Sequence, residues 1–211
     1  MKDFPFFTTE YGAAGLVLRE IPYRKTAYVT LHATQQPEEL LKECVSFCRV
    51  CGAETICATG HPYLEKYPFH TAIWRMSGPL SGAEPKAFLW PVLPENAEHW
   101  RQIYNRRMEQ VPNASYMTKA DAQAMLEKGD GYYIHKDGAL LGIGRASNDT
   151  IDTVVSVKPG AGELVFEALC SLLCGDRVQL EVASTNQRAI RLYERCGMIP
   201  TAEISKWYKI I

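Results

Sequence analysis

The chain has 211 residues, of which 46% are hydrophobic and 22% are charged, and its formal net charge is −1. This composition is ordinary for a globular protein with a full core, and the balanced charge, with no basic tract, argues against nucleic-acid binding. Because no apolar run is long enough for a signal peptide or a membrane-spanning helix, we expect a soluble cytoplasmic protein that does not interact with a membrane.

The seven cysteines are an odd number in a chain with no secretion signal, which argues against a disulfide framework. Cys48 and Cys51 form a CxxC pair, but they share an apolar helical face with Leu41 and Cys44, and no second CxxC follows. The five histidines have no metal-ligand spacing. We therefore expect buried cysteines and no metal, and a thiol-redox or zinc protein remains the least supported alternative.

The first third of the chain alternates segments of strand and helix character, expected at 26–33 (strand), 37–52 (helix), 54–60 (strand) and 71–78 (strand). Pro37 suits a first helical position, and Glu38 and Glu39 suit the helix N-terminus that follows. The helix is expected to end at Gly52. Residues 61–70 contain two prolines, so no regular element is expected there.

Residues 77–85 are rich in Gly, Pro and Ser and mark the expected domain boundary. Within the second part, Thr118 and Asp121 form a capping-box pattern, and Asp137-Gly138 is typical of a hairpin turn. The elements expected beyond the boundary are 87–94 (strand), 95–111 (helix), 118–129 (helix), 131–146 (hairpin), 151–157 (strand), 161–173 (helix), 178–185 (strand), 186–197 (helix) and an extended tail.

A strand–helix–strand pattern occurs twice, over 26–60 and over 151–185. Such units imply parallel strands joined by a helix, so the predicted fold class is α/β. The two units are either the remains of an internal duplication or two unrelated units of the same common type.

The most informative segment is LEVASTNQRAIRLYERCGM, in which Asn186 follows a strand and is placed to cap a helix. This segment resembles the C-terminal motif N-x-x-A-x-x-L-Y-E-x-x-G-[FM] of the GNAT superfamily of acyl-CoA N-acyltransferases. The matching residues are Asn186, Ala189, Leu192, Tyr193, Glu194, Gly197 and Met198. The order of elements over 86–211 is similar to that superfamily as well.

The resemblance implies a mixed sheet of the acyl-CoA N-acyltransferase type and transfer of an acetyl or other acyl group to a primary amine. Acetyl-CoA would be the co-substrate, and the acceptor would be a small molecule or a peptide. We expect residues 86–211 to form this domain and residues 1–80 to form a degenerate, structural half of the same fold.

The family's pyrophosphate loop reads [QR]-x-x-G-x-[GA], but here Val157-Lys158-Pro159 runs directly into a G-x-G. The arm with its Arg or Gln is missing, and Glu163 places a carboxylate at the helix start, where it stabilises the helix but repels a pyrophosphate. Two alternatives therefore stay open: a tight turn with no ligand, and a non-catalytic GNAT-like module that binds a ligand or serves as a scaffold. The cofactor-binding residues that the resemblance implies are Val155, Val157, Gly160, Ala161, Gly162 and Asn186.

Three side chains are candidates for catalysis. Asp152 and Glu181 lie on the two strands that would flank the acyl group, and either carboxylate could take a proton from the attacking amine. In the family, the tyrosine that matches Tyr193 commonly gives a proton to the departing thiolate. The structural alternatives are two ordinary surface acids and a core tyrosine.

Overall fold

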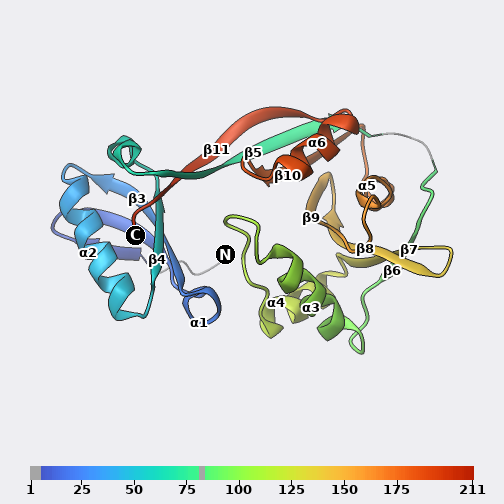
Figure 1. Cartoon of the computed structure of the whole chain (residues 1–211), viewed down its shortest axis with the longest axis horizontal. Coiled ribbons are helices and arrows are strands. Elements are labelled where there is room, and N and C mark those ends of the chain that lie inside the picture. The colour runs from blue at the N-terminus through green and yellow to red at the C-terminus, as the bar shows by residue number, and fades with distance from the viewer. Residues whose placement is uncertain (1–5, 81–83) are drawn as a thin grey trace. The chain divides into compact units, whose positions relative to one another are not determined.

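The computed structural model describes residues 6–80 and 84–211. The chain packs into two compact units, of which unit 1 comprises Met1–Ile73 with Ile204–Ile211 and unit 2 comprises Trp74–Glu203 (Figure 1). Two long strands, β5 (Phe69–Pro79) and β11 (Ile199–Lys209), contribute residues to both units.

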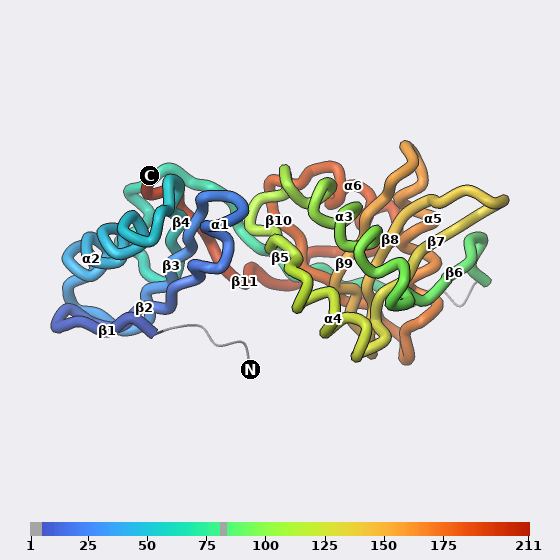
Figure 2. Tube along the Cα trace, turned by 90° about the horizontal axis from the view of Figure 1, so that it is seen from below, coloured from blue at the N-terminus to red at the C-terminus, as the bar shows by residue number. Residues whose placement is uncertain are grey.

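Unit 1 is built around a sheet whose strands lie in the order β1-β2-β3-β4-β11. The helix α2 lies against β2 and β3 and buries Leu40, Leu41, Cys44 and Cys48 (Figure 2). The other elements of this unit are β1 (Phe6–Thr9), β2 (Gly12–Val17), α1 (Ile21–Arg24), β3 (Thr26–Thr34), α2 (Pro37–Val50), β4 (Thr55–Thr59) and the 3-10 helix η1 (Pro62–Lys66).

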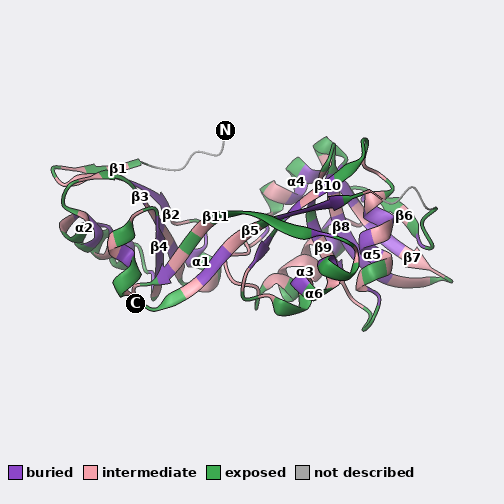
Figure 3. Ribbon diagram, turned by 90° about the horizontal axis from the view of Figure 1, so that it is seen from above, coloured by how far each residue is buried: buried purple, intermediate pink, exposed green. Residues whose placement is uncertain are grey.

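The parallel strands β3 and β4 pair continuously, from Thr26↔Thr55 to Thr30↔Thr59. On the other side of β4, the C-terminal end of β11 pairs in antiparallel fashion, with Tyr208 opposite Ala58. Tyr208 is the buried residue of β11. The rest of this strand is exposed or half-buried, and most of its ribbon is coloured as exposed in Figure 3.

Unit 2 is a mixed α/β unit in which the strands lie in the order β11-β5-β10-β9-β8-β7-β6. The helices α3 and α4 lie on one side of strands β7 to β9, and α5 lies on the other side (Figure 1). Its elements, besides the parts of β5 and β11, are β6 (Phe88–Pro91), α3 (Ala97–Met108), α4 (Lys119–Lys128), β7 (Gly131–Lys136), β8 (Ala139–Ser147), β9 (Thr150–Ser156), α5 (Gly162–Cys170), β10 (Arg177–Ala183) and α6 (Gln187–Arg195).

Two glycines of β8 bring α5 directly onto the sheet. A Cβ at Gly142 would lie 2.6 Å from Val165 Cγ2, and one at Gly144 would lie 2.3 Å from Leu169 Cδ1. Only a residue without a side chain permits this approach, and Val165 and Leu169 are both fully buried.

The opposite face of the sheet has a core of its own around Trp100 of α3, which is fully buried. Its indole N–H donates to the Tyr132 carbonyl at 3.0 Å, and its ring stacks on Tyr104. Met117 and Val155 belong to the same cluster. This core fixes α3 and the end of the following loop against the middle strands of unit 2.

Most local signals in the sequence are confirmed. Thr118 and Asp121 form the predicted capping box at the start of α4, and Asp137 and Gly138, with φ of +50° and +73°, form the predicted turn between β7 and β8. The β1–β2 hairpin was not predicted. Its second strand has the sequence GAAGLV, which lacks β-branched residues over its first half, and it is held by pairing with β3.

The last strand of each half of the chain is divided between the two units. Unit 2 begins at Trp74, within β5 and three residues before the predicted boundary at 77–85, and the last eight residues of the chain belong to unit 1. Residues 81–83 of that boundary lie outside the described residues. The first half ends in β3-α2-β4, a 3-10 helix and β5, and the second half ends in β9-α5-β10, the helix α6 and β11. This order favours the predicted partial repeat, which stays a prediction.

Candidate active site

The parallel strands β9 and β10 separate soon after they meet. In the described part of the chain they share one register pair, Gln179↔Thr150, and the Gln179 N–H donates to the Asp149 carbonyl at 2.9 Å. We call the region beyond this pair, residues 151–156 and 180–183, the β9–β10 divergence. In unit 1 the corresponding strands β3 and β4 stay paired over five residues. Of these two pairs of parallel strands in the described chain, the divergence therefore leaves backbone groups available to a ligand.

A β-bulge accounts for the point at which β9 departs. On the partner strand β8, Arg145 pairs with Thr153, whereas the next residue, Ala146, pairs with Ile151. Asp152 is therefore the extra residue of β9. A bulge bends its strand, increases the local twist and redirects a side chain, so the bulge both opens the divergence and sets the direction of the Asp152 carboxylate.

The pairing of β9 with β8 decides which amides are free. The Val157 N–H donates to the Leu141 carbonyl at 2.9 Å. Because bonding direction alternates along an antiparallel strand, Val155 also faces β8, whereas Val154 and Ser156 turn their backbone groups toward β10. The expected backbone contacts, Val155 and Val157, therefore pair with β8 in this register, and their contact with a cofactor stays a prediction. The sequence could not show this, because the register depends on the partner strand.

The start of α5 carries the other set of free amides. Gly160 has φ +81° and open space where a Cβ would be, and the Ala161 N–H donates to the Lys158 carbonyl, closing a turn. Ala161 occupies the N-cap position without a side-chain hydrogen bond. The first turn of α5, with Gly162 and Glu163, therefore presents N–H groups and the positive end of the helix dipole. The negative charge of the Glu163 carboxylate repels an anion at this helix N-terminus.

The helix α6 carries the motif residues. The Asn186 side chain accepts from the Ala189 N–H at 3.2 Å, which confirms the predicted N-cap and occupies the Asn186 oxygen. A Cβ at Gly162 would lie 3.1 Å from Leu192 Cδ2, so this glycine lets the start of α5 approach α6. Asn186 and Gly162 thus have structural contacts, and their predicted contact with a cofactor stays a prediction.

Tyr193 lies in the core between the two helices. Its side chain is 7% exposed, and its ring centroid lies 5.6 Å from that of Phe166 on α5. Burial, followed by the neighbouring Cys196, raises the pKa of the phenol above its ordinary value. No hydrogen bond to its hydroxyl is formed within residues 6–80 and 84–211. The phenol is therefore protonated at neutral pH and has a free donor.

The two candidate carboxylates differ in their surroundings. Glu181 is exposed and pairs with Arg75, Nη2 to Oε1 at 3.2 Å. Asp152 is exposed as well, yet partial burial of its carboxyl raises the pKa, Arg145 lowers it, and Asp130, Lys128 and Glu181 act more weakly. These charged groups are therefore close neighbours of the Asp152 carboxyl.

Sequence reasoning missed the ion pair beside Asp152. Arg145 donates to both carboxylate oxygens of Asp130, at 2.6 and 3.1 Å, and Asp130 is 5% exposed. A bidentate pair of this kind is rigid. It fixes a positive group next to the bulge, and neither residue belongs to a recognisable motif.

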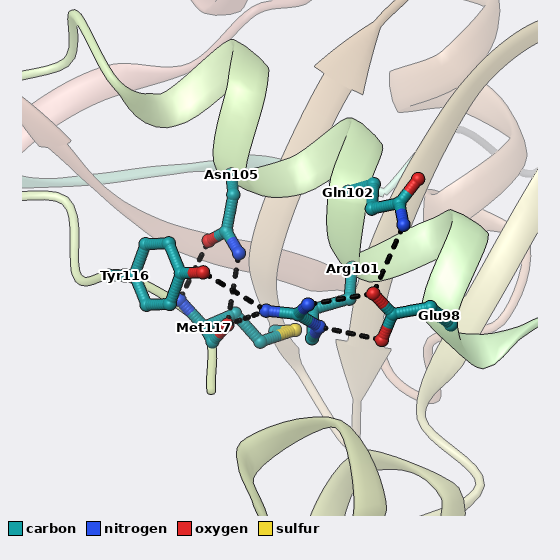
Figure 4. Close-up of polar contacts among 6 residues, drawn as sticks. All are labelled: Glu98, Arg101, Gln102, Asn105, Tyr116 and Met117. Atoms are coloured by element: carbon teal, nitrogen blue, oxygen red, sulfur yellow. Dashed lines mark hydrogen bonds and ion pairs between the residues drawn. The ribbon is translucent and has the colours of Figure 1, made fainter. Parts of the chain in front are cut away.

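A second missed network anchors the loop between α3 and α4 (Figure 4). Arg101 pairs with both carboxylate oxygens of Glu98, at 2.7 and 2.9 Å, and donates to the Tyr116 hydroxyl and the Met117 carbonyl. Asn105 accepts from the Met117 N–H at 2.8 Å and donates to its carbonyl at 3.0 Å. The end of the loop is therefore held to α3 by side chains and by main-chain groups.

The structure adds little to the metal and thiol alternative. Among the described residues no three His, Cys, Asp or Glu side chains come together as metal ligands. Cys48 is fully buried, as predicted, and burial raises the pKa of its thiol to about 11, whereas Cys51 is exposed at the end of α2. The described helices include none that is both long and apolar enough to cross a bilayer.

Comparison of sequences finds no matching family model and no matching curated protein. Comparison of structures finds a GCN5-related N-acetyltransferase from Sphaerobacter thermophilus, with a TM-score of 0.60 and 14% identity over 93% of this chain and 75% of that one. A functionally unknown conserved protein from Staphylococcus epidermidis gives a TM-score of 0.61 and 12% identity, over 98% and 93%. A GCN5-related N-acetyltransferase from Kribbella flavida gives a TM-score of 0.56 and 12% identity, over 99% of this chain and 89% of that one.

These identities are low, so the likeness concerns the fold alone. Each of the three comparisons covers more than nine tenths of this chain and therefore includes both units. The predicted α/β class and the resemblance drawn from the Asn186 helix are confirmed. The chain has the fold of the GCN5-related N-acetyltransferases, the GNAT fold.

Proposed function

We propose that unit 2 transfers an acetyl group from acetyl-CoA to a primary amine. The observation that carries this proposal is the β9–β10 divergence, because strands β9 and β10 pair at one position and then leave inward-facing backbone groups free. A sheet that served only as a scaffold would gain hydrogen bonds by closing this gap, as β3 and β4 do in unit 1.

Two sets of amides fit the co-substrate, which supplies the acetyl group as a thioester. The N–H groups of Val154 and Ser156 face the divergence, where a fixed donor would stabilise negative charge on a carbonyl oxygen. The first turn of α5, beginning at Gly162, offers N–H groups and a helix dipole suited to phosphate. The Glu163 carboxylate lowers the affinity of these N–H groups for phosphate but leaves the groups in place.

Asp152 is the base that the geometry favours. An alkylamine has a pKa near ~10.4 and must lose a proton before it can attack. A carboxylate accepts that proton more readily when its own pKa is raised toward neutral pH, and burial raises the pKa of Asp152. The Glu181 carboxylate already pairs with Arg75, which leaves it less available to take a proton from an amine.

Tyr193 is the group proposed to protonate the departing thiolate. We expect Tyr193→Phe to lower kcat by roughly ten- to a thousand-fold in an assay of thiol release from acetyl-CoA with a panel of primary amines. The melting temperature should change little, because the lost hydroxyl has no hydrogen-bond partner among the described residues. Tyr132→Phe, which removes a phenol that bonds the Gly129 carbonyl, is the matched control and should keep its activity. Full activity in Tyr193→Phe would reduce Tyr193 to a packing role.

One observation favours a second candidate function, a GNAT-fold module that binds acyl-CoA or another ligand without catalysis. The turn before α5 is short, and the Ala161 N–H is already bonded to the Lys158 carbonyl within it. The Glu163 carboxylate lies in the first turn of α5, where it repels an anion. Thiol release that does not exceed the rate without protein, together with binding of acetyl-CoA, would favour this candidate.

A further inference from the structure

The bidentate pair between Asp130 and Arg145 lies beside the candidate base, and no step of the proposed reaction uses it. Arg145 donates to Asp130 through Nε at 3.1 Å and through Nη2 at 2.6 Å. The Asp130 side chain is 6% exposed and that of Arg145 is 21% exposed, so both charges are largely withdrawn from water. The cost of desolvating two such charges offsets much of their attraction. Stability alone therefore does not account for the pair.

The backbone fixes the position from which the guanidinium extends. The Ala146 N–H donates to the Asp130 carbonyl at 3.2 Å, which ties the residue before β7 to β8. On the other side of β8, Thr153 of β9 lies opposite Arg145, and Asp152 is the extra residue of the bulge. In a bulge two residues oppose one residue of the partner strand. Asp152 is therefore a near neighbour of Arg145 across the two strands.

Asp152 and Arg145 lie on the same side of the sheet, the side that carries α3 and α4. Ile143, two residues before Arg145 on β8, belongs to the core on this side, so Arg145 points to it as well. Leu180, next to Glu181 on β10, belongs to the core on the α5 side, so Glu181 points to the α3 side. Both charges act on the Asp152 carboxyl. Because β9 lies between β8 and β10, the carboxylate is placed between them.

The charged groups that surround the Asp152 carboxyl come from several elements. They are Arg145 of β8, Asp130 before β7, Lys128 at the end of α4 and Glu181 of β10. Tyr104 of α3 lies near the same guanidinium. Among these charges Arg145 has the largest effect on Asp152, so it is the cation best placed to form an ion pair with this carboxylate.

We propose that Asp130 is a positioning residue: by binding the Arg145 guanidinium it keeps this cation from pairing with the Asp152 carboxylate. Asp152 then stays free to take a proton from the nitrogen of the acceptor amine onto a carboxylate oxygen. This inference rests on the proposed function. A carboxylate held in an ion pair is a weaker base, because the neighbouring cation stabilises its charged form. Asp130 satisfies the charge of Arg145 without taking a lone pair from the reaction.

A double-mutant cycle of melting temperatures tests this competition without an assay of activity. In the wild-type background Asp152→Asn should not lower the melting temperature, because Arg145 already has Asp130 as its partner. In the Asp130→Asn background Arg145 turns to Asp152. There Asp152→Asn should lower the melting temperature by roughly 5 °C or more, as when a largely buried charge loses its partner. The same effect in both backgrounds would overturn the inference, and so would an Asp130→Asn variant without a cooperative melt.

The pH profile of thiol release is the second readout. In Asp130→Asn the acid limb of kcat/KM should move to lower pH, and kcat at neutral pH should fall on the order of tenfold, because Asp152 is then held in an ion pair. The double variant Asp130→Asn/Arg145→Gln lacks the guanidinium and should recover most of the lost rate. Glu98→Gln is the matched control. It breaks another bidentate pair of unit 2, the one with Arg101, and should leave the acid limb in place.

The two readouts separate this inference from the proposed function. A double variant as slow as Asp130→Asn, or an acid limb that does not move to lower pH in Asp130→Asn, would overturn the inference and leave the proposed function standing. No acetyl-CoA-dependent thiol release by the wild-type protein with the amine panel would overturn the proposed function. A change of sign in the melting-temperature cycle would even then show that Asp130 and Asp152 compete for Arg145.

Discussion

A fragment of residues 86–211 is expected not to fold, because it lacks β5. The end of β5 lies beside β10, where the Leu80 N–H donates to the Asp176 carbonyl at 2.9 Å and Arg177 donates to the Ser77 hydroxyl. Met76 of β5 is fully buried in the core formed with α5 and α6. Losing a single buried side chain of this kind costs about 2–5 kcal/mol, against a total stability of about 5–15 kcal/mol for a typical domain.

Circular dichroism melts of three proteins measure this effect. The full chain is the reference, and the fragment 74–203 is the matched control, since it is unit 2 with its part of β5 restored. We expect a cooperative transition for 74–203 and none for 86–211. If 86–211 melted cooperatively at the temperature of the full chain, the part of β5 in unit 2 would have no energetic importance.

Asp152→Asn is expected to lower kcat by about 10²–10⁴-fold, the usual contribution of a general base. Asparagine has nearly the same shape but cannot take a proton. Glu181→Gln, on the neighbouring strand, is the matched control and should leave kcat within a few-fold, because Glu181 is exposed and pairs with Arg75. The reverse order of effects in the thiol-release assay would transfer the role of base from Asp152 to Glu181.

The same carboxyl sets the expected pH dependence. The pKa of Asp152 is raised in the folded protein, so its ionisation opposes folding. The protonated Asp152 carboxyl therefore contributes fully to the stability of the fold below the pKa that it has in the unfolded chain. This contribution is lost as the pH rises through the higher pKa that it has in the folded protein. Asp152→Asn should have a melting temperature at neutral pH that is no lower than that of the wild-type protein. The activity of the wild-type protein should fall as the pH drops through the raised pKa.

The parts of the fold that were predicted from sequence are set by neighbours in the chain. The cap made by Asn186, the capping box of Thr118 and Asp121, and the turn at Asp137-Gly138 each depend on residues at most three positions apart. The motif on α6 identified the GNAT fold because it combines such a cap with a specific pattern of apolar residues.

The features that sequence could not give depend on distant partners. The bulge at Asp152 exists because β8 and β9 pair in a shifted register, and the same pairing turns the amides of Val154 and Ser156 toward β10. The division of β5 and β11 between the units depends on which strands lie side by side in each unit. Periodicity along one strand carries no information about any of these pairings.

The central claim, that unit 2 binds acetyl-CoA, is tested most directly by a thermal melt with and without this compound. At about 100 times its dissociation constant, acetyl-CoA should stabilise the protein by about 2.7 kcal/mol, or roughly 5–10 °C for a chain of this size. Glu163→Gln removes the carboxylate at the start of α5 and should enlarge the shift, whereas Glu167→Gln, one turn later, should leave it unchanged. A melting temperature that stays the same at millimolar acetyl-CoA, in the wild-type protein and in Glu163→Gln, would contradict the claim.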